Sequence, residues 1–144
     1  MILQKLPTFL KKNSAKLLIK YDGERAVKKY TIKLLYSDAK RKSLGNDTDS
    51  PCDTLKEIFV GNSFFETDEI LKYFTNTISH GVDILKGKFG NESVISVILA
   101  EMDDGILYTL HIQTTKGFRH LSDTNYEQAC EMLLIEDIWK YCYN

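Results

Sequence analysis

The sequence predicts one α+β domain over residues 1–144, in which an antiparallel sheet built from two Asp-Gly hairpins is covered on one face by two helices. Three observations predict this fold class. Alternating apolar residues flank two Asp-Gly dipeptides, which favour tight hairpin turns. Two other segments carry apolar residues at helical spacing. The chain is 43% apolar and 27% charged, and a domain of this length buries a core without needing disulfides.

The first hairpin is predicted over residues 16–36, with a two-residue turn at Asp22-Gly23. Alternation divides its side chains between the two faces of the sheet. Lys29 and Lys33 then lie on the outer face, as expected for a sheet with one wet side. The residues that share the inner face are Leu17, Ile19, Tyr21, Ala26, Tyr30, Ile32, Leu34 and Tyr36.

The second hairpin is predicted over residues 94–115, with its turn closing on Asp104-Gly105. This register places Leu99 opposite Leu110. The hairpin has one apolar face, which needs cover from the helices. The residues of that face are Ile95, Val97, Leu99, Leu110 and Ile112.

The first covering helix is predicted over residues 67–86, with acidic residues in its first turn and Gly87 available beyond its end. Gly81 is its weakest position, and the helix could instead break at His80-Gly81. Its apolar stripe consists of Ile70, Leu71, Phe74, Ile78, Val82 and Leu85.

The second covering helix is predicted over residues 123–142, where Thr124 and Glu127 fit a capping box. Apolar residues occupy much of its circumference. We therefore expect this helix to be deeply packed or to meet another surface with its outer side.

A segment at about residues 37–53 is the one long stretch without a periodic pattern. It begins with the basic residues Lys40-Arg41-Lys42 and ends with acidic ones. Loops of this length are usually functional or disordered, so the segment is expected to be a mobile linker or a loop that contacts a partner.

The sequence contains no phosphate-binding loop, nucleophile elbow or dinucleotide fingerprint. We therefore predict a protein that is not an enzyme and that needs no cofactor and no metal. His111, Lys116 and His120 leave one alternative open, because two imidazoles and an ammonium group could act on a phosphodiester as in a ribonuclease. The other interpretation is two ordinary surface histidines.

The three cysteines, Cys52, Cys130 and Cys142, are an odd number at spacings that match no paired metal site. They predict reduced thiols and a cytoplasmic protein, although a bridge from Cys52 stays open for an exported one. No apolar run approaches the length that spans a bilayer, so no membrane association is expected.

Charge is unevenly distributed along the chain. Residues 1–42 hold twelve Lys or Arg against three acids, and residues 43–144 hold seven against seventeen, so the two parts carry +9 and −10. Such asymmetry favours a charged partner. The alternative is that both parts interleave their charges on one folded surface.

Nucleic-acid binding is the alternative function. The lysines of the N-terminal hairpin, together with Lys40-Arg41-Lys42, could bind phosphates, and tyrosines such as Tyr21 and Tyr30 could stack bases. Alternation places these tyrosines on the buried face, away from the lysines, which favours a different function.

In size and in its Lys-, Asn- and Ile-rich composition, the whole chain resembles the immunity proteins of bacterial polymorphic toxin systems, including contact-dependent growth inhibition. The resemblance implies a small cytosolic domain without catalytic activity. It also implies tight binding to a cognate toxin, often a nuclease, whose active site or substrate groove it covers.

Acidic residues are the candidates for binding a basic partner. Glu127 and Glu131 stand four residues apart on one helix face, a like-charge pair that costs a few tenths of a kcal/mol unless it is neutralised. Asp47, Asp49 and Asp53 lie on or beside the long loop. These five residues are the predicted partner-binding site.

Overall fold

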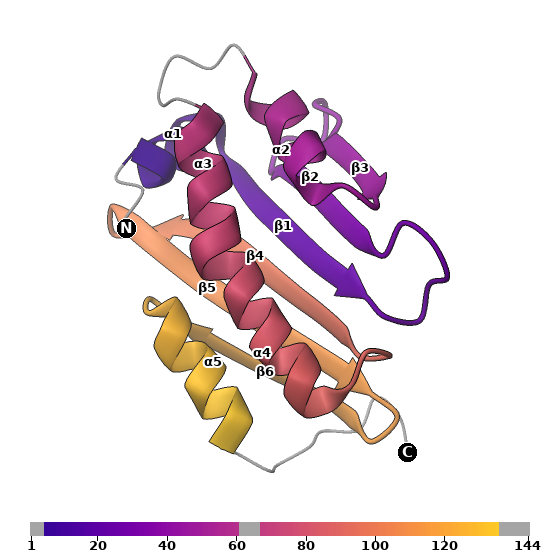
Figure 1. Cartoon of the computed structure of the whole chain (residues 1–144). Helices are drawn as coiled ribbons and strands as arrows, with labels where there is room; N and C mark the ends of the chain where they lie inside the picture. Colours follow the sequence, from indigo (N-terminus) through magenta and orange to yellow (C-terminus); the bar gives the residue numbers. More distant parts are fainter. Residues whose placement is uncertain (1–4, 61–66, 136–144) are drawn as a thin grey trace.

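The computed structural model describes residues 5–60 and 67–135, and within them six strands form one antiparallel sheet in the order β3-β2-β1-β4-β5-β6 (Figure 1). The strands are β1 (Ala15–Asp22), β2 (Tyr30–Tyr36), β3 (Leu44–Thr48), β4 (Val94–Met102), β5 (Gly105–Thr114) and β6 (Gly117–Asp123). The helices are α1 (Lys5–Asn13), α2 (Pro51–Phe59), α3 (Thr67–Tyr73), the π-helical turn η1 (Phe74–Ile78), α4 (Ser79–Phe89) and α5 (Tyr126–Ile135). The predicted α+β class is confirmed.

The described helices all pack on the same face of the sheet, where they form the core (Figure 1). Along β1, β4 and β5 every second side chain is buried in this core, and Ile19, Val97 and Leu110 are at most 2% exposed. Each such side chain stabilises the fold by roughly 1.5–3 kcal/mol. Besides the two predicted helices, α1 and α2 contribute Leu6, Phe9, Leu10, Leu55 and Phe59.

The paired strands of the first hairpin have the predicted faces, but its turn is different. Ala26, predicted on the inner face, is exposed in the connecting loop. Tyr21 pairs with Tyr30, so residues 23–29 form a wide loop instead of a two-residue turn. Gly23 is needed for a different reason: a Cβ there would collide with the backbone of Asn91. The backbone amide of Gly23 donates a hydrogen bond to the carbonyl of Ser93 at 3.0 Å.

The second hairpin turns one residue earlier than predicted. Met102 pairs with Gly105, and the turn residues Asp103 and Asp104 have φ of 51° and 63°. Positive φ at both central positions defines the type I′ turn that suits a two-residue hairpin, and Asp tolerates it. Leu99 therefore pairs with Tyr108 rather than Leu110, a shift of two residues that leaves every side chain on its predicted face.

The predicted helix over 67–86 is a continuous helical run from Thr67 to Phe89 that contains the π-helical turn η1. The run does not break at Gly81. A glycine is needed at this position because the ring of Tyr126 occupies the space where a Cβ would lie. It ends at Gly90, which has φ of 96° and donates its amide to Lys86, and not at Gly87. No helix in the described ranges is long and apolar enough to cross a membrane.

Asn125 caps the start of helix α5, and its side-chain oxygen accepts the amide of Gln128 at 2.9 Å. The predicted cap was Thr124, one residue earlier. Arg119 of β6 donates to the carbonyl of Leu133 at 2.9 Å and so holds α5 over the edge of the sheet. The predicted continuation over 136–142 lies outside the described residues.

The segment at about 37–53 is not one long loop. It contains the edge strand β3, which pairs with β2, and the start of α2 at Pro51. Residues 44–47 of β3 are exposed, so the strand has no hydrophobic alternation that a sequence pattern could reveal. Backbone pairing and polar side chains hold it in place instead.

Cys52 and Cys130, the two cysteines that the structure describes, are not joined in a disulfide. Cys130 is buried in the core, and burial raises the pKa of its thiol to about 11, so it is inert at neutral pH. Cys142 lies outside the described residues.

Two glycines of α4 provide a matched test of this packing. Gly81→Ala should destabilise the protein by about 1–3 kcal/mol, because the new Cβ would lie 2.5 Å from the hydroxyl oxygen of Tyr126 and must displace that ring. Gly87→Ala should stabilise it by about 0.5–1 kcal/mol, since Gly87 has no neighbour within 4 Å. Chemical denaturation measures both, and equal effects would contradict the packing described.

Candidate functional site

The five acidic residues predicted to bind a partner lie at two opposite edges of the sheet. Asp47 is on edge strand β3, and Asp49 and Asp53 follow it at the start of α2. Glu127 and Glu131 are on α5, which packs over β6, the other edge (Figure 1). The structure therefore does not bring the five together into one surface.

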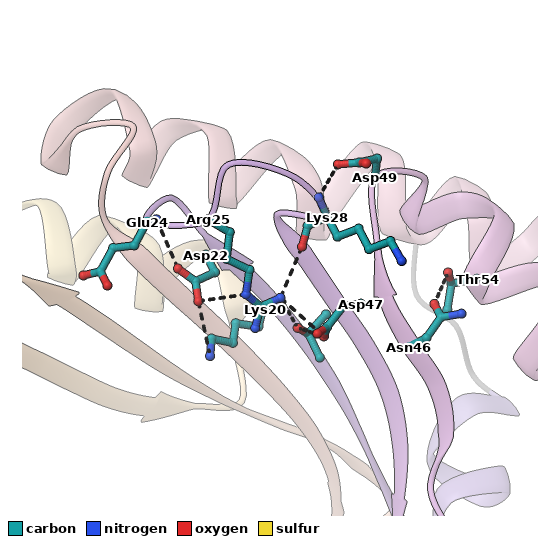
Figure 2. A network of polar contacts seen from close by, with 10 residues as sticks. Lys20, Asp22, Glu24, Arg25, Lys28, Asn46, Asp47, Asp49 and Thr54 are labelled. Atoms are coloured by element: carbon teal, nitrogen blue, oxygen red, sulfur yellow. Dashed lines mark hydrogen bonds and ion pairs between the residues drawn. The ribbon is translucent and has the colours of Figure 1, made fainter.

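Asp47 and Asp49 hold the loop of residues 23–29 against β3 (Figure 2). Asp47 accepts a hydrogen bond from the Thr31 hydroxyl at 2.6 Å and lies 3.3 Å from the Arg25 guanidinium. Asp49 accepts the backbone amide of Lys28 at 2.7 Å. These two carboxylates have structural partners, whereas Asp53 is exposed in the first turn of α2.

Arg25 connects the basic and acidic parts of the chain. It lies 3.2 Å from Asp22 and also donates to the Thr31 hydroxyl at 3.0 Å (Figure 2). The Thr31 hydrogen bond and, next, the Arg25 charge hold the pKa of Asp47 below its ordinary value of 3.8. At this edge of the sheet the two parts of the chain interleave their charges, which was one of the two interpretations of the charge asymmetry.

Glu127 and Glu131 border a groove between η1, α4 and α5. The groove has a volume of about 300 Å³, and one wall comes from Thr77 and His80. Its other wall comes from α5, with Cys130 deeper in the packed layer. Both glutamates are exposed, so their carboxylates are accessible from this groove.

A second cavity of about 660 Å³ shares Thr77, Tyr126 and Glu127 with the first. It extends towards α1 and the turn between β4 and β5, where Asp103 and Asp104 are exposed. Both cavities together are called the acidic groove below. None of the described residues that line it is Lys or Arg.

Three buried phenols form the floor of the larger cavity. The hydroxyls of Tyr73 and Tyr108 form a hydrogen bond with each other, and the hydroxyl of Tyr126 donates a hydrogen bond to the carbonyl of Ile78 at 2.7 Å. The rings of Tyr108 and Tyr126 are 5.3 Å apart. Burial raises the pKa of all three phenols, so they stay neutral and the negative charge of the groove comes from its carboxylates.

Lys11 forms an ion pair with Asp104 at the edge of the acidic groove. Its ammonium lies 3.5 Å from Asp104, with both side chains more than half exposed. Exposed pairs of this kind are worth about 0–1 kcal/mol and are screened by salt, so Asp104 remains available to a partner.

His111 and His120 lie directly opposite each other on β5 and β6, on the face of the sheet away from the helices. They are neighbours, as an acid–base pair requires, but neither lines the two cavities of the acidic groove. Within the described ranges, no three His, Cys, Asp or Glu side chains are grouped so as to hold a metal ion.

Sequence reasoning found Glu127 and Glu131 but missed the other half of the groove. Asp103, Asp104 and Tyr108 lie within the predicted hairpin over 94–115, and Tyr73 lies within the predicted helix over 67–86, but no functional role is predicted for any of them. No local signal joins these residues, because β4, η1 and α5 meet only in the folded chain. Comparisons with protein-family models, curated proteins and solved structures found no match.

The pKa of Asp47 tests the polar network at β3. Ionised Asp47 stabilises the fold above pH 3.8, and this contribution is lost as the pH falls through its lowered folded-state pKa. Thr31→Val should raise that pKa towards 3.8, which makes this stabilising contribution smaller and narrows the pH range over which it is lost. An NMR titration of the Asp47 carboxyl carbon measures the shift.

Arg25→Gln provides the comparison for this titration. It should also raise the pKa of Asp47, because both the charge and the hydrogen bond of Arg25 lower it. An unchanged pKa of Asp47 in either variant would contradict the assignment.

Proposed function

We propose that this protein is a non-enzymatic binding module of the immunity class, which binds and neutralises a cognate toxin, a nuclease being the main candidate. One observation carries the proposal. The acidic groove is bordered by Asp103, Asp104, Glu127 and Glu131, and no basic residue in the described part of the chain lines it. A nuclease domain that binds nucleic-acid phosphates presents the opposite charge.

The placement of the glutamates supports a basic partner. Glu127 and Glu131 face the same groove four residues apart on α5, and this like-charge pair costs the isolated helix a few tenths of a kcal/mol. Asp47 and Asp49 differ, because Arg25 and Lys28 already satisfy them. Glu127 and Glu131 are therefore exposed at the groove, whereas Asp47 and Asp49 are engaged within the chain.

The shape of the groove indicates how the partner binds. Its volume and its tyrosine floor accommodate a long side chain, whose hydrocarbon stem contacts rings such as Tyr126 while its cationic end meets Glu127. Arginine fits best, because its planar head pairs with carboxylates through two hydrogen bonds and stacks on aromatic rings. We expect one or more arginines of the toxin to enter here.

This proposal places the protein in the cytoplasm, where an immunity protein meets a toxin that attacks nucleic acid. The product of the adjacent gene is the first candidate partner. The two chains are expressed together, one of them with a tag, and co-purification of the untagged chain is measured. Catalysis plays no part in neutralisation, because covering the substrate groove of the toxin is sufficient.

Replacing the two groove glutamates tests the proposal. Glu127→Gln with Glu131→Gln should weaken binding to the co-purified partner by at least about 1.5 kcal/mol, the lower range for close charge pairs across a tight interface. Titration calorimetry measures this. Folding stability should be unchanged or slightly higher, because a like-charge repulsion is removed.

Helix α2 offers a matched control, because Asp53 and Glu57 form the same four-residue spacing and are both exposed. Asp53→Asn with Glu57→Gln should leave affinity unchanged. A larger loss from this pair than from the α5 pair would move the interface to the β3 edge. Unchanged affinity in both double variants would show that these four acidic residues lie outside the interface.

A further inference from the structure

The face of the sheet opposite the helices forms a second surface. No described helix packs on it, and its strand side chains are mostly half-buried or exposed, in contrast to the fully buried inner face. Strand residues on this open face include Lys16, Lys20, Asp22, Lys33, Asp47, His111, Phe118 and His120.

Three rings gather at the β5–β6 end of the open face. The Phe118 ring lies 5.3 Å from the His111 ring and 6.2 Å from the His120 ring, with interplanar angles of 20° and 17°. Burial and the neighbouring His120 both lower the pKa of His111, which favours its neutral form. The three rings form one nearly parallel set with π-faces suitable for stacking another flat ring.

Positive charge lies at the other end of the same face. Lys16 and Lys20 come from β1 and Lys33 from β2. The acids on this side are Asp22 and Asp47, and Arg25 lies within 3.3 Å of both. The ammonium of Lys20 also lies 3.8 Å from Asp22. Three lysines and Arg25 stand against these two carboxylates, so this end of the face keeps a net positive charge.

The register of the sheet places Lys20 in one row with the two histidine rings. Lys20 pairs with Ser96, Ser96 with His111, and His111 with His120, so this row crosses β1, β4, β5 and β6. Neighbouring strands are about 4.8 Å apart, which puts Lys20 about 10 Å from His111 along the row. A flexible anionic chain lying across the strands meets the rings and the lysines in succession.

We propose that the open face binds single-stranded nucleic acid, with bases stacked on Phe118 and the two histidines and phosphates bound by Lys16, Lys20 and Lys33. A single strand is required because its bases are free to stack on side-chain rings, whereas those of a duplex already stack on each other. The surface is separate from the acidic groove, which lies on the helical side, so this activity is independent of toxin binding.

This site differs from the one suggested by the sequence alone. Tyr21 and Tyr30 are on the helical face, as alternation predicts. Arg41, from the basic triplet 40–42, lies 4.2 Å over the Tyr36 ring and donates to the carbonyl of Asn13 at 2.7 Å. The rings that can stack bases are instead those of β5 and β6.

Fluorescence anisotropy with a labelled single-stranded oligouridine of about 20 nucleotides tests the stacking rings. At low salt the full chain should bind this probe and bind a duplex of equal length more weakly. Phe118→Ala should weaken binding roughly tenfold, whereas Phe118→Tyr, which keeps the ring, should retain it. Circular dichroism and thermal melting confirm that both variants fold.

The salt dependence of binding tests the lysines. Lys16→Gln with Lys33→Gln should reduce the slope of log affinity against log salt by about 1.4, which corresponds to two lost phosphate contacts. Lys72→Gln with Lys88→Gln, on the exposed side of the helices, makes the same charge change and should leave the slope unchanged. Absence of binding by the wild-type chain at low salt, equal loss in both lysine pairs, or unchanged binding by a folded Phe118→Ala variant would overturn the proposal.

Discussion

The antiparallel pairing of β1 with β4 is the contact on which the rest of the structure depends. It brings Leu17 opposite Leu99 and Ile19 opposite Val97, across more than seventy residues of chain, and joins two three-stranded units into one sheet. Its end is secured where the Tyr21 hydroxyl donates to the carbonyl of Asn91 at 2.7 Å. Only this joined sheet offers an apolar face wide enough for the helical run from α3 to α4 to cross.

The joined sheet also separates the two surfaces on which the functional proposals rest. The helical layer creates the acidic groove, because α5, η1 and the β4–β5 turn meet above the same side of the sheet. The opposite side keeps Lys20 and the two histidine rings in register across four strands. A partner on one side leaves the other accessible, so the chain has room for a protein and a nucleic acid at once.

Which side chains face the core could be predicted from the sequence, because an alternation of period two survives an even error in register. The turn positions could not, since Asp103 and Asp104 adopt positive φ without a glycine and Gly23 serves a close backbone approach. Strand β3 carries no apolar pattern at all. In the acidic groove, the four-residue spacing of Glu127 and Glu131 on one helix made this pair predictable from the sequence. Asp103, Tyr73 and Tyr108 reach the groove only through tertiary contacts, which no local pattern indicates.

The composition of β3 bears on why the sheet does not grow further. It is five residues long, contains Gly45 with φ of 102°, and directs Asp47 and Asn46 into contacts with its own neighbours. A short, kinked, polar edge is a poor template for a strand from a second molecule. The polar residues that leave β3 without an apolar alternation thus also disfavour edge-to-edge aggregation and help to keep the protein dispersed at high concentration.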